Sequence, residues 1–250
     1  MKRICSCTLT PGPVIIALPN TKRNRAALQT VFQRAADRRI FMKYNHIVFD
    51  VDGTLINTAR NILTALKDAL MTTDGLSYEI SDLTFSLACP SVVTLDRLKV
   101  EDPDATLAVW IENEKKYTDM FYIFDGIKEL LVQLRKSGCH LGIITSRTHE
   151  ELELIFDVLP LCQYFTTIIC SDDVTSPKPA PDPLLKYMEM TGADKSRILY
   201  VGDTLHDISC ASAAGTASAL AVWGTHEKEA PADYHPGTPE ELGRLLLQDN

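Results

Sequence analysis

The sequence predicts an α/β fold, a doubly wound parallel sheet whose chain is interrupted by an inserted all-α unit. Three observations lead to this prediction. Apolar runs of strand length alternate with helical patterns from residue 42 onward, as they do in βαβ units. Roughly ninety residues separate the first run from the second, far more than one crossover helix requires. Polar residues directly follow the runs, where parallel sheets bind their ligands.

The strands are expected where short apolar runs are separated by helical patterns. These runs cover residues 47–49, 141–144, 167–170, 198–201 and 217–222. Their continuous apolar character is typical of strands that helices cover on both faces. Between the runs, residues 126–136 place apolar side chains on one helical stripe that stops before Gly138, and residues 181–190 form another helical pattern. The sequence therefore predicts a layered α/β core.

The long segment between the first two strands is expected to form a helical cap of its own. Helices are predicted for residues 58–71, 81–87, 91–98 and 103–122, each beginning near a capping residue or a proline. We expect this cap to cover residues 57–124. Residues 42–56 and 125–250 would then form the α/β core into which it is inserted.

The first 41 residues differ in charge from everything that follows. They contain eight lysines and arginines but only one acidic residue, a net +7, which leaves −15 for residues 42–250 given the total of −8. The segment fits neither a secretory signal, because its apolar run is too short, nor a typical transit peptide, because it has one serine. We expect residues 1–41 to be a disordered extension, or to precede a native start at Met42. Cys5 and Cys7 would make only a weak metal site.

The overall composition excludes several classes of protein. The chain has 250 residues, of which 45% are hydrophobic and 23% charged, as in ordinary globular proteins. Its negative charge disfavours nucleic-acid binding, which depends on clustered lysine and arginine, and no apolar stretch is long enough to span a bilayer. Seven scattered cysteines, an odd number, are typical of thiols in a reducing compartment. We therefore expect a cytoplasmic protein without nucleic-acid or membrane partners.

Two carboxylates follow the first predicted strand. Asp50 and Asp52 are separated by one residue, and side chains at i and i+2 of a strand share a face. Carboxylates held this close repel each other unless they share a proton or a cation. A divalent metal ion with a preference for oxygen ligands is therefore expected beside them.

The ends of the other predicted strands also carry polar residues. Thr145 and Ser146 follow the second strand, a segment that ends at Lys178 follows the third, and Asp203 and Asp207 follow the fourth. Because ligands of parallel α/β sheets bind beyond the carboxyl ends of the strands, these groups are expected to converge on one site. A site with hydroxyls, one lysine and several carboxylates suits a metal ion and a phosphate group.

Four motifs in this order resemble those of the haloacid dehalogenase superfamily. They are Asp50-Val51-Asp52-Gly53-Thr54-Leu55, Ile143-Ile144-Thr145, Lys178-Pro179 and Gly202-Asp203-Thr204-Leu205-His206-Asp207. The position of the predicted cap is similar to that in the phosphoglycolate phosphatase and β-phosphoglucomutase branch. The resemblance implies a Rossmann-like core with strand order 5-4-1-2-3 and the Asp50 strand at its centre.

The resemblance also implies a role for each of these residues. Asp50 would be the nucleophile that forms an aspartyl-phosphate, and Asp52 the general acid and base. Thr145, Lys178 and the backbone of Ser146 would bind the phosphoryl oxygens. The cofactor would be Mg²⁺, held by Asp50, the backbone carbonyl of Asp52, and Asp203, with Asp207 supporting the metal shell from the first turn of a helix that Gly215 ends.

The predicted function is hydrolysis of small phosphorylated metabolites by a phosphoglycolate phosphatase-like enzyme that is a monomer or a weak homodimer. One alternative is a phosphomutase, but the predicted cap carries a net charge of −5, whereas binding a second phosphate calls for a basic cap. Another is a non-catalytic phosphometabolite-binding module, which the retained catalytic set disfavours. Phosphoglycolate, pyrophosphate, nucleoside monophosphates and sugar phosphates all remain candidate substrates, because Cys89 departs from the glycine common in the cap loop of relatives.

Two further residues near the motifs have more than one interpretation. Arg147 is expected either to contact phosphate or to be a surface charge at the start of a helix. His206 lies inside the fourth motif, at a position that the superfamily does not use for catalysis, so we expect it at the surface or behind the site.

Overall fold

The computed structural model describes residues 42–88 and 91–247. The expectations for residues 1–41, including the Cys5 and Cys7 pair, lie outside these residues, as does the expectation for Cys89. Within the described ranges, none of the helices combines the length and the apolar character needed to cross a bilayer.

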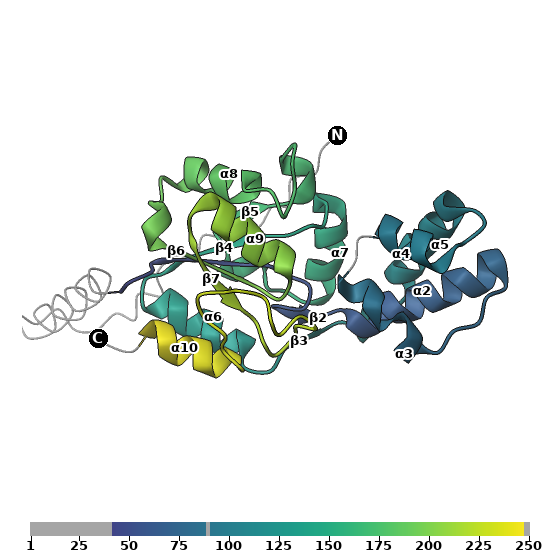
Figure 1. The fold of residues 1–250 in the computed structure, drawn as a ribbon. Coiled ribbons are helices and arrows are strands. Elements are labelled where there is room, and N and C mark those ends of the chain that lie inside the picture. Colours follow the sequence, from purple (N-terminus) through teal and green to yellow (C-terminus); the bar gives the residue numbers. More distant parts are fainter. Residues whose placement is uncertain (1–41, 89–90, 248–250) are drawn as a thin grey trace, which may run out of the picture.

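The core is a five-stranded parallel sheet with the order β5-β4-β1-β6-β7 (Figure 1). Its strands are β1 (His46–Phe49), β4 (His140–Ile144), β5 (Thr167–Ile169), β6 (Ile198–Gly202) and β7 (Ala217–Leu220). When the strands are numbered along the chain and the sheet is read from β7 to β5, the order is 5-4-1-2-3, which confirms the predicted topology and the α/β class. β1 lies at the centre and pairs with β4 and β6, so residues after it face the middle of the sheet's carboxyl edge.

Alternate residues of β1 pack into two separate layers. Ile47 and Phe49 join the core formed with α6 (Ile127–Lys136), α7 (His149–Val158) and α10 (Pro239–Leu247). Val48 joins the core on the other face, formed with α8 (Asp182–Thr191) and α9 (Leu205–Ala214). Helices therefore cover both faces of the sheet, and successive side chains of one strand stabilise opposite layers.

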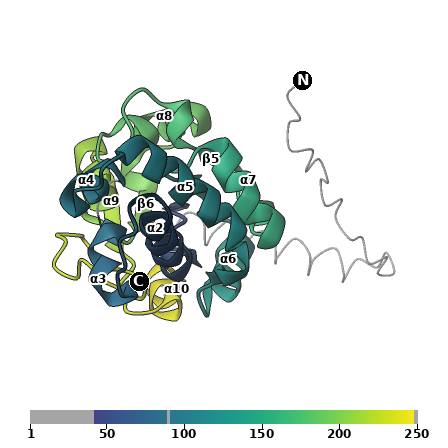
Figure 2. The ribbon, with the colours of Figure 1, turned by 90° about the vertical axis from the view of Figure 1, so that its right-hand side faces the viewer.

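The segment between the first two strands of the sheet forms a helical insert beside the core (Figures 1 and 2). It contains α2 (Ala59–Asp74), α3 (Ile80–Leu83), η1 (Thr84–Ala88), α4 (Ser91–Leu98), α5 (Pro103–Lys116) and η2 (Thr118–Met120). Leu66, Leu70 and Trp110 belong to an apolar cluster of the insert alone. The chain enters and leaves the insert through β2 (Ile56–Asn57) and β3 (Tyr122–Ile123), which pair antiparallel.

Two predicted helices are shorter than expected. The helix expected over residues 103–122 ends at Lys116, and its last residues form η2 and β3 instead. β3 pairs with β2, so its backbone is extended and cannot continue the helix. Residues 81–87 form the end of α3 and a 3₁₀ turn.

Two helices were not predicted. α7 begins with a capping box, in which Thr148 Oγ1 accepts the N–H of Glu151 and Glu151 Oε2 accepts the N–H of Thr148. This Thr-x-x-Glu pattern is a sequence signal that could have located the helix. The second unpredicted helix, α10, follows the last strand. The remaining connections contain three short 3₁₀ turns, η3 (Cys162–Tyr164), η4 (Ser171–Asp173) and η5 (Lys195–Arg197).

Gly142 in β4 lies against the ring of Tyr187 on α8. A Cβ atom at this position would be 2.4 Å from Tyr187 Cε2. Tyr187 is fully buried, and its hydroxyl is 3.1 Å from His46 Nδ1 on β1. The ring therefore has little freedom to withdraw, and the sheet requires glycine here for close packing.

We expect Gly142→Ala to lower the free energy of unfolding by about 1 to 3 kcal/mol, because overpacking forces the ring or the strand to shift. The measurement is urea unfolding at neutral pH. Gly237→Ala is the matched control, since that glycine is exposed and an added Cβ would meet only the flexible Glu241 side chain. Equal stabilities of the two variants would contradict the role assigned to this contact.

Candidate active site

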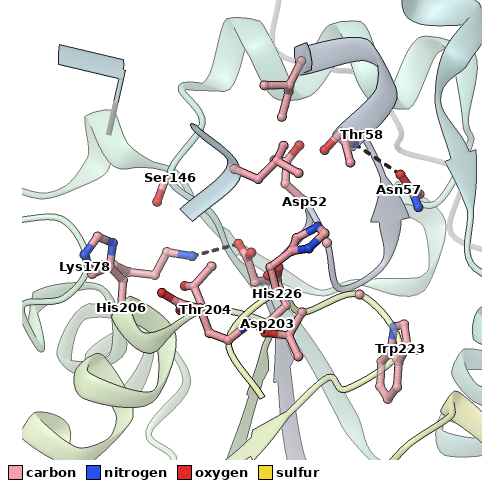
Figure 3. Close-up of a pocket in the computed structure, with 18 of the residues that line it drawn as sticks. Asp52, Asn57, Thr58, Ser146, Lys178, Asp203, Thr204, His206, Trp223 and His226 are labelled. Atoms are coloured by element: carbon pink, nitrogen blue, oxygen red, sulfur yellow. Dashed lines mark hydrogen bonds and ion pairs between the residues drawn. The ribbon is translucent and has the colours of Figure 1, made fainter. Parts of the chain in front are cut away.

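A cavity of about 690 Å³ lies where the carboxyl ends of the strands face the helical insert. Asp50, Lys178 and Asp203 line it from the core, and Ile62 and Leu87 line it from the insert. Figure 3 shows Lys178 and Asp203 directed toward the same space. The structure thus brings the polar ends of separate strands together, as expected for a parallel sheet.

Lys178 lies between two carboxylates at the base of this cavity. Its Nζ donates hydrogen bonds to Asp50 Oδ1 at 2.8 Å and to Asp207 Oδ1 at 2.7 Å. All three side chains are buried. Burial opposes the charge of Lys178, but the two carboxylates outweigh it and raise its pKa. Burial raises the pKa of Asp50 to about 7 despite the lysine, and Asp207 and Asp52 add to this effect.

Asp207 is held by protein donors on both oxygens. Besides Lys178, its Oδ1 accepts the hydroxyl of Tyr200 at 2.9 Å, and its Oδ2 accepts the N–H and hydroxyl of Thr204 at 3.0 and 2.6 Å. Burial opposes ionisation of Asp207, but Lys178 and these donors lower its pKa below the ordinary value. Asp207 therefore stays charged. From its place in the first turn of α9 it fixes the position of Lys178.

Asp203 has weaker compensation, from the Thr54 hydroxyl, which donates to its Oδ1 at 3.4 Å, and from the charge of Lys178. The pKa of Asp203 is raised well above the ordinary value, first by burial and then by the charges of Asp207 and Asp50. Asp50, Asp203 and Asp207 each offer an oxygen within 4.8 Å of the others. A Cβ on Gly53, whose φ is +71°, would lie 2.1 Å from Asp203 Oδ2, so glycine makes room for this carboxylate. The three carboxylates exceed the charge of one lysine, and their oxygens suit a hard divalent cation such as Mg²⁺.

Thr145 and Ser146 occupy different positions at the end of β4. Ser146 lines the cavity and is visible beside Lys178 in Figure 3. Thr145 is buried, and its hydroxyl accepts the N–H of Arg147 at 3.2 Å. Of these two residues, Ser146 is therefore the one that faces the cavity.

The side chains of Asp50 and Asp52 pair with different cationic residues, Lys178 and Arg147 respectively. The metal ion expected beside both stays a prediction. β1 ends at Phe49, and the chain turns so that the N–H groups of Leu55 and Ile56 both reach the carbonyl of Val51. Because the pair lies in this turn rather than in the strand, its side chains take different directions. Asp52 accepts two hydrogen bonds from Arg147, from Nε and from Nη2, each at 2.7 Å. Burial opposes ionisation of Asp52, but Arg147 prevails and lowers its pKa.

Arg147 connects Asp52 to the helical insert. Its Nη1 lies 3.6 Å from Glu114 Oε2 on α5, and only 14% of its side chain is exposed. Burial raises the pKa of Glu114 to about 7, even though Arg147 acts in the opposite direction. The expectation of a surface charge is wrong for Arg147, because its side chain is largely buried in an ion pair with the predicted acid and base. The alternative, a contact with phosphate, stays a prediction. No sequence pattern links residues 52, 114 and 147.

The loop after β7 forms another wall of the cavity that sequence reasoning missed. Trp223 and His226 lie on this wall (Figure 3), and Trp223 Nε1 donates to the carbonyl of Thr54 at 2.9 Å. His206 also lines the cavity, and it is exposed, which agrees with the expected surface position. Trp223 and His226 come from a segment without a recognisable motif, so only the fold reveals their place.

Comparisons with known proteins agree with this geometry. The family model described as haloacid dehalogenase-like hydrolase matches residues 47–221. A phosphoglycolate phosphatase of Aquifex aeolicus is 31% identical over 206 residues, which cover 80% of this chain and 95% of that protein. The pyrophosphatase PpaX of Bacillus cereus is 31% identical over 186 residues, covering 73% and 85% respectively. A crystal structure of a Lactobacillus plantarum protein, provisionally described as a phosphoglycolate phosphatase, superposes with a TM-score of 0.74, 26% identity and coverage of 82% and 100%.

The raised pKa of Glu114 predicts a pH dependence of stability. Between the ordinary pKa of 4.5 and the folded value of about 7, the folded protein keeps a proton that the unfolded chain loses. The free energy of unfolding therefore falls as the pH rises through this range. Glu114→Gln removes this loss, so the variant should be close to the wild type at pH 5 and more stable by about 1 to 3 kcal/mol at pH 8.

Denaturant unfolding across this pH range is the measurement. Glu112→Gln is the matched control, because Glu112 is exposed on the same helix and its replacement should change stability by no more than about 0.5 kcal/mol at any pH. Parallel stability curves for the wild type and Glu114→Gln would contradict the prediction.

Proposed function

Because the chain belongs to the haloacid dehalogenase-like hydrolase family, we propose that it is a Mg²⁺-dependent phosphatase of small phosphorylated metabolites that acts through an aspartyl-phosphate on Asp50. The observation that carries this proposal is the position of Lys178 between Asp50 and Asp207, with Asp203 beside them at the base of the cavity. A phosphoryl group that enters this cavity would meet a nucleophile, a fixed cation and uncompensated carboxylates together.

In the proposed first step, an oxygen of Asp50 attacks the phosphorus atom. The bond from phosphorus to the leaving oxygen breaks, and the leaving oxygen takes a proton from Asp52. In the second step a water molecule attacks the phosphorus, Asp52 takes a proton from that water, and the carboxylate of Asp50 is released with inorganic phosphate. Each proton given up by Asp52 in the first step is thus regained in the second.

Arg147 constrains the part that Asp52 plays in this scheme. In the structure both oxygens of Asp52 accept hydrogen bonds from Arg147. Asp52 must therefore leave Arg147 before it can protonate a leaving oxygen. Since Arg147 is also 3.6 Å from Glu114 on α5, a movement of the insert relative to the core would change this contact.

The residues present fit a magnesium ion. Asp50, Asp203 and the backbone carbonyl of Asp52 would hold it, and Asp207 would support this group through Lys178. When bound, Mg²⁺ supplies positive charge that offsets the repulsion between the carboxylates and a phosphate group. Lys178 would hold a phosphoryl oxygen as negative charge shifts in the transition state, and Ser146 would offer a further donor from the cavity wall. The buried hydroxyl of Thr145 would support Ser146 from behind the cavity wall.

The cavity wall contributed by the insert supports hydrolysis over phosphate transfer between two positions. Its lining residues are Asn57, Thr58, Ala59, Ile62 and Leu87. Lysine and arginine are absent from this part of the wall among the described residues, so it offers no cation for a second phosphate group. The relatives reported above make phosphoglycolate and pyrophosphate the first substrates to measure.

Asp50→Asn is expected to reduce phosphate release by on the order of 10³-fold or more, because the amide cannot form the covalent intermediate. The measurement is release of phosphate from an aryl phosphate, phosphoglycolate and pyrophosphate with Mg²⁺ present. Asp119→Asn, an exposed change on η2, should leave activity unchanged. Turnover that survives Asp50→Asn would refute the proposed nucleophile.

Asp203→Asn is expected to raise the Mg²⁺ concentration required for half-maximal activity by roughly tenfold or more. Loss of a residue that only hydrogen-bonds to a metal ligand already lowers metal affinity by about this factor, and Asp203 is proposed as a ligand itself. Activity is titrated with Mg²⁺ after treatment with a chelator, again with Asp119→Asn as the control. An unchanged Mg²⁺ requirement would remove Asp203 from the metal site.

A further inference from the structure

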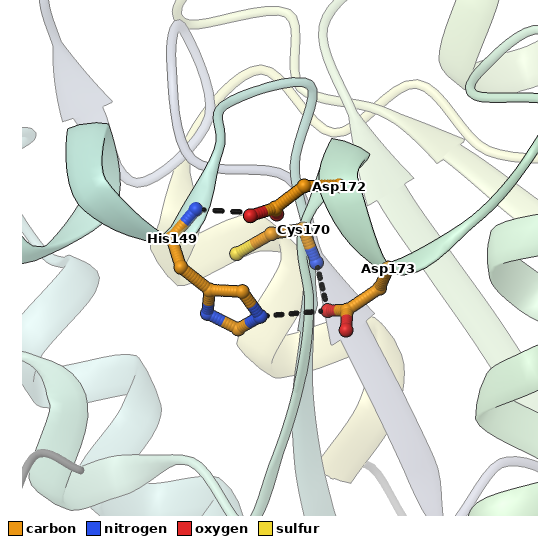
Figure 4. A group of neighbouring side chains, drawn as sticks. All are labelled: His149, Cys170, Asp172 and Asp173. Atoms are coloured by element: carbon orange, nitrogen blue, oxygen red, sulfur yellow. Dashed lines mark hydrogen bonds and ion pairs between the residues drawn. The ribbon is translucent and has the colours of Figure 1, made fainter. Parts of the chain in front are cut away.

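A second group of potential metal ligands lies outside the cavity. It consists of His149, Cys170, Asp172 and Asp173, whose ligand atoms all lie within 4.8 Å of one another (Figure 4). His149 is the first residue of α7, whereas the other three belong to the end of β5 and the turn η4. Two loops at the carboxyl edge of the sheet therefore contribute side chains to one place.

Hydrogen bonds hold these four residues in position. His149 Nε2 lies 2.9 Å from Asp173 Oδ2, and the same oxygen accepts the N–H of Cys170 at 2.9 Å. Asp172 Oδ1 accepts the N–H of His149 at 3.2 Å. The sulfur of Cys170 accepts the N–H of Asp173, so the thiol is directed toward the turn although the residue is buried.

We propose that His149, Cys170, Asp172 and Asp173 form a second metal site, selective for a borderline divalent ion such as Zn²⁺. The ligand chemistry carries this assignment. One sulfur, one imidazole nitrogen and two carboxylate oxygens form a four-ligand set of the kinds that Zn²⁺ uses. The Asp50, Asp203 and Asp207 group offers only oxygen, the choice of harder ions such as Mg²⁺. The two groups are thus distinguished by their donor atoms.

Metal binding at this group requires the loss of one proton. The Cys170 thiol, whose pKa burial raises to about 12, gives its proton to solvent when its sulfur bonds to the ion. The thiolate and two carboxylates then bring three negative charges to the dication. Lys186, whose Nζ is 3.6 Å from Asp173 Oδ1, offsets the remaining one.

The ligands can approach one another as an ion binds. Bonds of about 2.0 to 2.3 Å bring ligand atoms closer together than 4.8 Å. His149 and Asp172 are exposed, so these two side chains can move inward, and 53% of the His149 side chain is open to solvent. The ion therefore has both a route of entry and two adaptable ligands.

A metal ion here would connect two loops that border the phosphatase site. Ser171, which lines the cavity, lies between Cys170 and Asp172, and its N–H donates to the carbonyl of Arg147 at 2.9 Å. His149 follows Arg147 by two residues. Binding would fix the loop carrying Arg147 relative to the loop carrying Ser171.

Cobalt spectroscopy tests this site without relying on phosphatase activity. The probe is Co²⁺ added to the full chain in excess Mg²⁺, with Cys5, Cys7 and Cys89 replaced by serine so that they supply no thiolate. We expect a thiolate-to-cobalt charge-transfer band and the visible bands of four-coordinate Co²⁺. Cys170→Ser should abolish the charge-transfer band, and His149→Ala should weaken Co²⁺ binding roughly tenfold or more. Cys162→Ser is the matched control and should retain the band.

Absence of the charge-transfer band from the parent protein would overturn the proposal. So would a band that persists in Cys170→Ser, or Co²⁺ affinity that is unchanged in His149→Ala. Thermal unfolding provides an independent measurement, because Zn²⁺ that binds the folded chain should raise the Tm of the parent and of Cys162→Ser but not that of His149→Ala. The exposed His149 side chain makes this variant informative even if the buried Cys170 substitution impairs folding.

Discussion

Lys178 and the two carboxylates it joins determine how the rest of the site is arranged. Its ammonium group lies 2.8 Å from Asp50 and 2.7 Å from Asp207, which follow β1 and β6 respectively. Burial of any one of these charges without the others is costly. The three strand ends must therefore form together, and the tyrosine and threonine donors to Asp207 fix the lysine from behind. Among the described residues no lysine or arginine forms an ion pair with Asp203, so this cluster would suit a divalent cation.

The two aspartates of the first motif differ because the chain turns between them. Burial raises the pKa of Asp50 to about 7, whereas Arg147 overcomes burial at Asp52 and lowers the pKa of that carboxyl. Where one carboxyl attacks and its neighbour donates a proton, the raised pKa usually belongs to the proton donor. The two shifts are reversed here, which agrees with the requirement that Asp52 leave Arg147 before it can donate a proton. Here the difference depends on Arg147, and Arg147 in turn contacts Glu114 of the insert. The environment of Asp52 is thus coupled to the position of a helix remote in sequence.

The sheet and most of its helices could be predicted because their hydrophobic periodicity is local. Strand ends then located Asp50, Ser146, Lys178, Asp203 and Asp207 around one site, since parallel topology brings such ends together. The contacts of Asp52 could not be predicted, because they join residues 52, 114 and 147 and depend on how the insert packs on the core. Trp223 and His226 were missed for the same reason. The two-residue strands β2 and β3 are too short to produce a periodic pattern at all.

Those two short strands have an evolutionary consequence. Asn57 pairs with Tyr122, so the chain leaves the core and returns to it at adjacent points. The insert has its own apolar cluster, and the sheet has two others. Because the chain leaves and re-enters the core at neighbouring points, the core can accept an insert of different length or shape without rearranging its strands. Changes in the insert can therefore alter the choice of substrate while the reactive side chains of the core stay the same.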